Sequence, residues 1–241
     1  MIDIIKPNIF DSNKIIAGVT KINKTEEFPL GFSITPALIY DEKQIANFRK
    51  TLCENLNLKK ENFIIQKQIH SDIIRIVGIN SQIEESDAMI CSEKGVVLNV
   101  SIADCAAILI HCPDIDTVAG IHSGWQGTSL NITGKTIRYL IENFQADAKL
   151  IKAFISPCAS SEMYEVEWDV AKLFPFHTKQ ISDTKYLFDN KSQIIEQLLE
   201  KGVPLENIEC SEICTISDTN YHSYRRDKNQ SGRMSAFIGM I

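Results

Sequence analysis

Apolar side chains recur along this chain with two different periods, and the longer period predicts helices. Over residues 41–58 apolar positions return every three or four residues with charges between them, which indicates an amphipathic helix. The same spacing predicts helices over residues 128–144 and 190–201. Gly202 and Pro204 follow the last of these as a stop signal.

Shorter apolar runs, rich in β-branched residues, predict strands. They cover residues 73–77, 87–90, 95–110, 118–121, 150–155 and 233–240, with one interruption at Ala103-Asp104-Cys105. The runs between residues 73 and 121 are expected to be adjacent buried strands of one sheet. Strands interleaved with helices predict an α/β fold, a single domain over residues 1–241 with a layered α-β-α arrangement around a mixed β-sheet.

The bulk composition narrows the possible classes of function. With 44% hydrophobic and 23% charged residues, the chain has the composition of a globular protein with a substantial core. A net charge of -6 provides no basic field for nucleic acid, and no apolar run is long enough to span a membrane. The seven cysteines are an odd number in a chain without a visible signal peptide, which favours reduced thiols and a cytoplasmic location. The oligomeric state is left open.

Potential metal ligands occur at or near the ends of three predicted strands. These are His70 in the segment Gln68-Ile69-His70-Ser71, Cys105 inside the interruption of the longest run, and His122 at the end of residues 118–121. Because strand ends meet at one edge of a sheet, these side chains are expected to converge. Two imidazoles and one thiolate suit Zn²⁺, and three protein ligands leave a fourth position open for chemistry. The spacing matches no short metal motif, so three satisfied core residues are the alternative at this point.

The same segments resemble the motifs of the YfiH-like family, also described as laccase-domain or polyphenol-oxidoreductase proteins. The resemblance covers most of the chain from about residue 68 onward, and its pieces occur in the family's order. The matching segments are Gln68-Ile69-His70-Ser71, residues 86–90, residues 102–109, residues 119–128 with Gly124-Trp125-Gln126-Gly127-Thr128, Ser223-Tyr224-Arg225-Arg226-Asp227 and Gly232-Arg233-Met234.

The resemblance implies a mixed sheet between helices, of the cysteine-hydrolase type, and a zinc ion bound by His70, Cys105 and His122. It also implies action on purine nucleosides, with phosphate as a second substrate in the phosphorylase case. Members of the family are similar to phosphorylases that split adenosine, inosine or 5′-methylthioadenosine, and to adenosine deaminases. Some relatives are linked instead to amide hydrolysis in peptidoglycan precursors, which is an alternative function.

The family's older name suggests copper, but the histidine count argues against a multicopper enzyme. A trinuclear copper cluster with a further copper site needs about eight histidines, because His is the usual ligand. This chain has five. Zinc is therefore favoured, and a single copper in the His₂Cys site, acting as a polyphenol oxidase, is the alternative.

The chain departs from the family pattern at three positions. Gln126 stands where the family has Arg, which removes a cation and favours water over phosphate as the nucleophile. Glu162 and Met163 replace a pair of cysteines. These departures keep open the alternative of an inactive, metal-stabilised binding protein.

The motifs suggest further site residues. Catalytic roles are expected for Asp104, Cys105 and His122, and substrate contacts for Gln68, Gln126, Tyr164, Arg225 and Arg226. Asp104, Glu162 and Glu165 are candidates for a general acid or base because they lie near the motifs. Two alternatives are structural: an Arg–Asp pair within residues 224–227 that ties down the C-terminal hairpin, and Thr128 as the N-cap of the helix that follows it.

Overall fold

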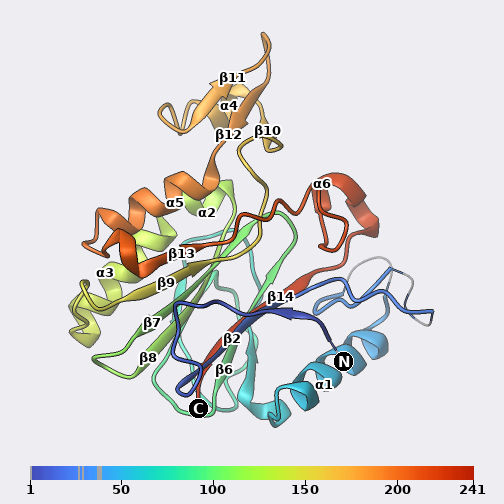
Figure 1. Ribbon diagram of the computed structural model, residues 1–241, viewed down its shortest axis with the longest axis vertical. Coiled ribbons are helices and arrows are strands. Elements are labelled where there is room, and N and C mark those ends of the chain that lie inside the picture. Colours follow the sequence, from blue (N-terminus) through green and yellow to red (C-terminus); the bar gives the residue numbers. More distant parts are fainter. Residues whose placement is uncertain (1, 27, 29, 37–39) are drawn as a thin grey trace.

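The computed structural model describes residues 2–26, 28, 30–36 and 40–241 of the chain (Figure 1). Most of its strands form two mixed sheets. The first has the order β1 (Ile4–Ile5), β2 (Ile15–Thr20), β14 (Met234–Met240), β6 (Val97–Ile102), β3 (Phe63–Ile65). The second has the order β13 (Ile208–Cys210), β9 (Lys152–Ile155), β7 (Ala106–Cys112), β8 (Thr117–Ser123), β5 (Ala88–Cys91), β4 (Ile74–Ile76). Parallel and antiparallel neighbours occur in both sheets.

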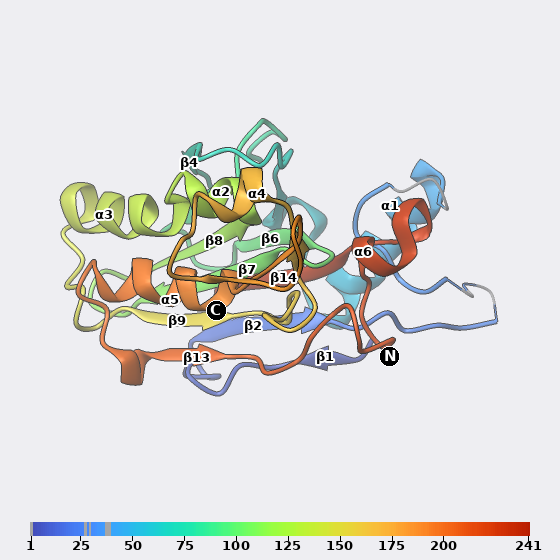
Figure 2. The same ribbon diagram turned by 90° about the horizontal axis from the view of Figure 1, so that it is seen from above.

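The two sheets pack face to face, and helices cover their outer faces (Figure 2). Helix α1 (Glu42–Asn55) packs on the first sheet and begins at Asp41, whose carboxylate caps it in a capping box with Gln44. Helices α3 (Ile132–Phe144) and α5 (Asn190–Leu199) pack on the second sheet. The expected α/β class, with mixed β-structure between helices, is confirmed, and its β layer is double.

Strand β6 shows why the core forms between the sheets. Its side chains alternate, so that Leu98, Val100 and Ile102 point toward the second sheet while Val97 points toward α1. All of these side chains are buried, and full burial of such a side chain contributes about 1.5–3 kcal/mol. A strand that is buried on both faces is therefore sandwiched between the second sheet and a helix.

The expectation that the runs between residues 73 and 121 belong to one sheet is wrong. Strands β4, β5, β7 and β8 share the second sheet, whereas β6 lies in the first. Ala103-Asp104-Cys105 carries the chain across from β6 to β7. Strands β6 and β7 are each buried on two faces, so their sequences look alike. Only their partners assign them to different sheets, because β6 pairs with β14 and β7 pairs with β8.

The predicted helix over residues 128–144 is two helices. Helix α2 (Trp125–Ser129) ends before Asn131, which has a left-handed backbone (φ 59°) and caps α3 by accepting from the Gly134 N–H. Thr128 is therefore not an N-cap. Its hydroxyl lies 2.8 Å from the Ser123 hydroxyl and donates to the Asn190 side-chain oxygen.

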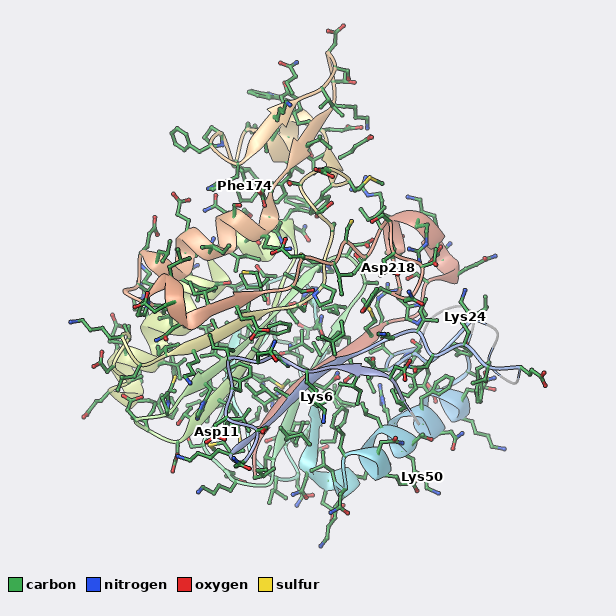
Figure 3. All side chains as sticks on the ribbon, viewed as in Figure 1. Lys6, Asp11, Lys24, Lys50, Phe174 and Asp218 are labelled. Atoms are coloured by element: carbon green, nitrogen blue, oxygen red, sulfur yellow. The ribbon has the colours of Figure 1, made fainter. Side chains whose placement is uncertain are left out.

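A small three-stranded sheet projects from the body and was not predicted (Figure 1). It consists of β10 (Glu165–Val166), β12 (Tyr186–Phe188) and β11 (Thr178–Gln180), with the short helix α4 (Trp168–Ala171). Phe174 lies where the projection joins the body (Figure 3), stacked on Phe188 with the ring centroids 4.3 Å apart. The remaining short helices are η1 (Lys60–Asn62), η2 (Leu205–Asn207), α6 (Tyr224–Asp227) and η3 (Lys228–Gln230). Among the described residues, no helix has the length and apolar character needed to cross a membrane.

Candidate metal centre

Three side chains from different parts of the chain converge as predicted. One ligand atom each from His70, Cys105 and His122 lies within 4.8 Å of the other two. The two imidazole rings are nearly perpendicular, with centroids 4.9 Å apart. The donors are two nitrogens and one sulfur, close enough for a single ion to reach all three. The structure therefore contains a possible His-Cys-His metal site.

His70 lies in the loop between β3 and β4, and a buried carboxylate determines the shape of that loop. The backbone N–H groups of His70 and Ser71 donate to Asp87 at 3.1 and 2.6 Å, and the Ser71 hydroxyl donates to it at 2.7 Å. Ile69 N–H donates to the same carboxylate. These bonds stabilise His70 in a left-handed backbone conformation (φ 60°) that its side chain would otherwise disfavour.

Cys105 ends the connection between the two sheets, immediately before β7. Gly124, the N-cap of α2, leaves the space that the sulfur fills. A Cβ atom at Gly124 would lie 2.6 Å from Cys105 Sγ and 3.5 Å from His70 Cδ2. Glycine is required here by close approach rather than by backbone strain, because its φ is -84°.

His122 is near the C-terminal end of β8 and is buried. Its Nδ1 lies 2.8 Å from Asp87 Oδ1. Because a carboxylate accepts, Nδ1 carries the proton and Nε2 is left as the ligand atom. This carboxylate–histidine pair is the arrangement that orients imidazoles in protein metal sites.

The charges at the centre reinforce one another. Burial raises the pKa of the Cys105 thiol, but the imidazoles of His122 and His70 lower it by more, so that the pKa is about 6. Burial lowers the pKa of His122, but the Cys105 thiolate and Asp87 raise it, to about 9. Burial also raises the pKa of Asp87, yet its hydrogen bonds from His122 and Ser71 bring it to about 2. A thiolate at neutral pH is the form of cysteine that binds metals.

The three ligands open onto one cavity of about 550 Å³. Its other described lining residues are Thr35, Gln66, Lys67, Gln68, Ser101, Ala103, Tyr224 and Arg233. None of these lining residues is an aspartate or a glutamate. Of the substrate contacts expected from the sequence, Gln68 lines this cavity, with its amide bonded to the backbone of Ser101.

Asp104 lies beside the centre but its carboxylate holds other parts of the chain. Oδ1 accepts from the Thr215 hydroxyl at 2.8 Å, and Oδ2 accepts from the Arg225 N–H at 2.6 Å. Its own carbonyl accepts from the Ala159 N–H. Asp104 thus fastens two distant segments next to Cys105, and it is not among the residues that line the cavity.

The two adjacent arginines near the C-terminus have different surroundings. Arg226 donates to the carbonyls of Thr215, Ile216 and Tyr221 and forms a two-point pair with Asp227. Asp218, whose carbonyl also accepts from Arg226, lies close to α6 in Figure 3. Arg226 therefore ties down the C-terminal segment, as the structural alternative proposed. Arg225 instead lies over the ring of Tyr164, 5.6 Å from its centroid.

The other residues expected at the site do not line the cavity. Gln126 is exposed on α2. Tyr164 is buried in the cluster at the base of the projecting sheet, beside Phe188. Glu165 is exposed on β10, and Glu162 lines different surface cavities.

Sequence reasoning missed Asp87 and the cavity residues Gln66 and Arg233. Asp87 had a visible signal, because it is a carboxylate at the start of a wholly apolar strand. Arg233 lies within the Gly232-Arg233-Met234 segment, but nothing in the sequence connects it with His70. Only the pairing of β14 with β6 brings it to this edge of the fold.

Comparison with known proteins identifies the family. The family described as multi-copper polyphenol oxidoreductase laccase matches residues 29–241. The chain belongs to this family. Among curated members, a purine nucleoside phosphorylase of Clostridium acetobutylicum is 32% identical over 194 residues, which are 78% of this chain and 80% of that protein. One of Aquifex aeolicus is 30% identical over 214 residues, 88% of this chain and 97% of that protein.

Two solved structures have the same fold. YlmD from Geobacillus stearothermophilus has a TM-score of 0.89 at 26% identity, over 97% of this chain and 94% of that one. The hypothetical protein YfiH of Bacillus licheniformis has a TM-score of 0.89 at 25% identity, over 94% and 93%. The resemblance to the YfiH-like family is thereby confirmed.

The family's description mentions several coppers, but the described residues contain one candidate ligand cluster. The three histidines outside it have partners elsewhere. His111 packs against Phe10, His177 bonds to Glu196, and His222 bonds to the carbonyl of Phe32. The described histidines therefore provide no trinuclear copper site.

Proposed function

We propose that this protein is a zinc-dependent purine nucleoside phosphorylase. The observation that carries the proposal is the convergence of His70, Cys105 and His122 on one cavity without carboxylates. Curated relatives of similar length are named purine nucleoside phosphorylases. Two nitrogens and one thiolate suit zinc, with a position left open for substrate.

The absence of Asp and Glu from the described cavity lining favours phosphorolysis over deamination. Zinc deaminases use a carboxylate as general acid and base to move protons between water and the departing ammonia. The candidates for that task, Asp104, Glu162 and Glu165, do not line this cavity. Phosphate needs no such base, because it is already an anionic nucleophile. This reverses the preference for water that Gln126 suggested.

In the reaction, the glycosidic C1′–N9 bond breaks and a C1′–O bond to phosphate forms. The purine leaves with the proton that phosphate gives up, so the products are the free base and ribose 1-phosphate. When bound, zinc supplies Lewis-acid stabilisation of negative charge. Asp87 holds His122 in the ligand tautomer, and its bonds to the backbone of the His70 loop position the second imidazole.

The test combines metal analysis with product analysis on the same samples. Wild-type protein should contain zinc and release hypoxanthine from inosine only when phosphate is present, with ribose 1-phosphate as the second product. Cys105→Ala should lose both zinc and turnover, because it removes the thiolate ligand. His177→Gln is the matched control, since its ring bonds to Glu196 far from the cavity.

Three results would contradict the proposal. They are copper in place of zinc in protein grown with both metals, release of base without phosphate, and conversion of adenosine to inosine as the only reaction. Zinc with no turnover of any purine nucleoside would leave the site in place and favour the amidase or binding-protein alternative.

A further inference from the structure

Arg233 is a half-buried cation with no carboxylate partner in the described part of the chain. Its Nη1 donates to the carbonyls of Ser231 and Gly232 at 2.9 and 2.8 Å. The guanidinium carbon lies 5.5 Å from the centroid of the Tyr224 ring. These contacts fix the plane of the guanidinium, while Nε and Nη2 donate to no described residue.

Gln66, another residue of the cavity lining, also has a side-chain donor without an acceptor. Gln66 is only 4% exposed, and its Oε1 accepts from the Ser86 hydroxyl at 2.9 Å. That bond leaves Nε2 buried without a hydrogen-bond partner among the described residues. Buried polar groups in native proteins are almost always paired, so an orphan donor on a residue of the cavity lining points to a ligand that accepts hydrogen bonds.

The cavity lining contains two cationic side chains and no carboxylate. Gln66 and Arg233 line the cavity together with the candidate metal ligands and Lys67, and the one anionic group of the described lining is the Cys105 thiolate, a candidate metal ligand. Lys67 lies at the rim, exposed and paired with Glu85. A local excess of donors and cations is notable in a chain whose net charge is -6. Such a group of donors and cations favours the binding of an anion with several acceptor oxygens.

We propose that Arg233 and Gln66 form an oxyanion subsite beside the metal centre, and that its ligand is inorganic phosphate. A guanidinium with two unused nitrogens presents the forked donors that match two oxygens of phosphate. The assignment of this phosphate as the attacking substrate rests on the proposed phosphorolysis, whereas the binding of the anion does not. The subsite also explains how the cavity can have a cation although position 126 is Gln and exposed.

The first test is binding of phosphate to the zinc-loaded protein, measured as the shift of its melting temperature at constant ionic strength. Phosphate should stabilise the wild type and Arg138→Gln, an exposed control on α3. Arg233→Gln should weaken phosphate binding about tenfold or more, because a charged hydrogen-bond donor is lost. Gln66→Leu should weaken it less. Zinc content, measured in each variant, should stay at the wild-type level.

The second test is steady-state kinetics with inosine and phosphate. Arg233→Gln should raise the KM for phosphate about tenfold or more while the KM for inosine changes little. Arg233→Lys should recover part of the loss, since it restores charge without the fork. If Arg233→Gln also loses zinc, the KM for phosphate in Arg233→Lys and Gln66→Leu decides whether the subsite binds phosphate.

The possible results separate the two proposals. Phosphate binding that depends on Arg233, in a protein without nucleoside turnover, would support the subsite and refute the proposed function. Unchanged phosphate binding in both Arg233→Gln and Gln66→Leu would overturn the subsite, whatever the turnover. Inosine 5′-phosphate that binds through Arg233, with no response to inorganic phosphate, would overturn the assignment to the free anion.

Discussion

Asp87 Oδ1 lies 2.8 Å from His122 Nδ1, and the same carboxylate accepts the backbone N–H groups that shape the loop of His70. One buried side chain thus positions two of the three candidate metal ligands. The bonds to the His70 loop come from residues 69–71, and the bond to His122 comes from a different strand. Removing its charge should therefore disturb the centre without removing any ligand.

Asp87→Asn is expected to lower zinc affinity about 10- to 100-fold, the usual effect of losing a carboxylate that orients a histidine ligand. The amide cannot accept from all the donors that the carboxylate satisfies. Zinc affinity can be measured by competition with a chromophoric chelator, with circular dichroism to show that the fold is retained. Asp72→Asn is the matched control, because Asp72 is a more exposed carboxylate of the same loop that pairs with Lys135. Equal affinities for wild type and Asp87→Asn would refute the positioning role.

Gly124→Ala tests the geometry at the third ligand. The new Cβ would lie 2.6 Å from Cys105 Sγ, so either the sulfur or the start of α2 must move. Zinc affinity is expected to fall by about tenfold or more, although no ligand is changed. Ser129→Ala, a small change on the exposed side of the same helix, should leave affinity unchanged. Full zinc affinity in Gly124→Ala would contradict the requirement for glycine at this position, because it would show that the sulfur keeps its place.

Of the candidate metal ligands, Cys105 and His122 could be found from the sequence because each interrupts or ends an apolar run, whereas His70 lies in a loop and was indicated by its motif alone. His122 is conspicuous because it directly follows the apolar run of residues 118–121, which is buried in the structure. Its family motif adds a second signal. The sheet assignment could not be found in this way. Strand β6 pairs with β14, which is more than a hundred residues later, and no local pattern indicates that partner.

The neighbouring arginines show a similar limit at the level of side chains. Arg225 and Arg226 are adjacent and chemically identical, so the sequence gives both the same candidate role. Helix α6 turns them in different directions, and only Arg226 meets the carbonyls of residues 215–221. Which of two adjacent arginines is buried depends on tertiary contacts that spacing does not encode.

Arg226→Gln should therefore reduce stability more than Arg225→Gln does. Arg226 donates to four backbone carbonyls and to Asp227, with 24% of its side chain exposed. Its loss should lower the free energy of unfolding by roughly 3 kcal/mol, since several charged hydrogen bonds disappear and their acceptors are left unpaired. Arg225→Gln should change it by less than about 0.5 kcal/mol. Urea unfolding of both variants measures the difference, and equal losses would contradict the structural role of Arg226.

His222 provides a prediction about pH. Burial lowers its pKa to about 4, and its contacts suit the neutral ring: Nε2 donates to the Phe32 carbonyl at 2.7 Å, and Nδ1 accepts from the Gly232 N–H. In the unfolded chain a histidine has a pKa of about 6.5. As pH falls from about 6.5 to about 4, this histidine binds a proton in the unfolded chain but stays neutral in the folded protein. The free energy of unfolding therefore decreases.

The decrease attributable to His222 should approach roughly 3 kcal/mol across that interval. His222→Gln cannot take up this proton, so its stability should depend less on pH there, even if it is lower at neutral pH. Urea unfolding of metal-free wild type and variant at several pH values isolates the effect, because all other titrating groups are common to both. The difference in unfolding free energy between them should shrink as the solution is acidified. A difference that stays constant from about pH 7 to about pH 4 would show that His222 is not held neutral by the fold, and that the segment leading to Arg233 is anchored in another way.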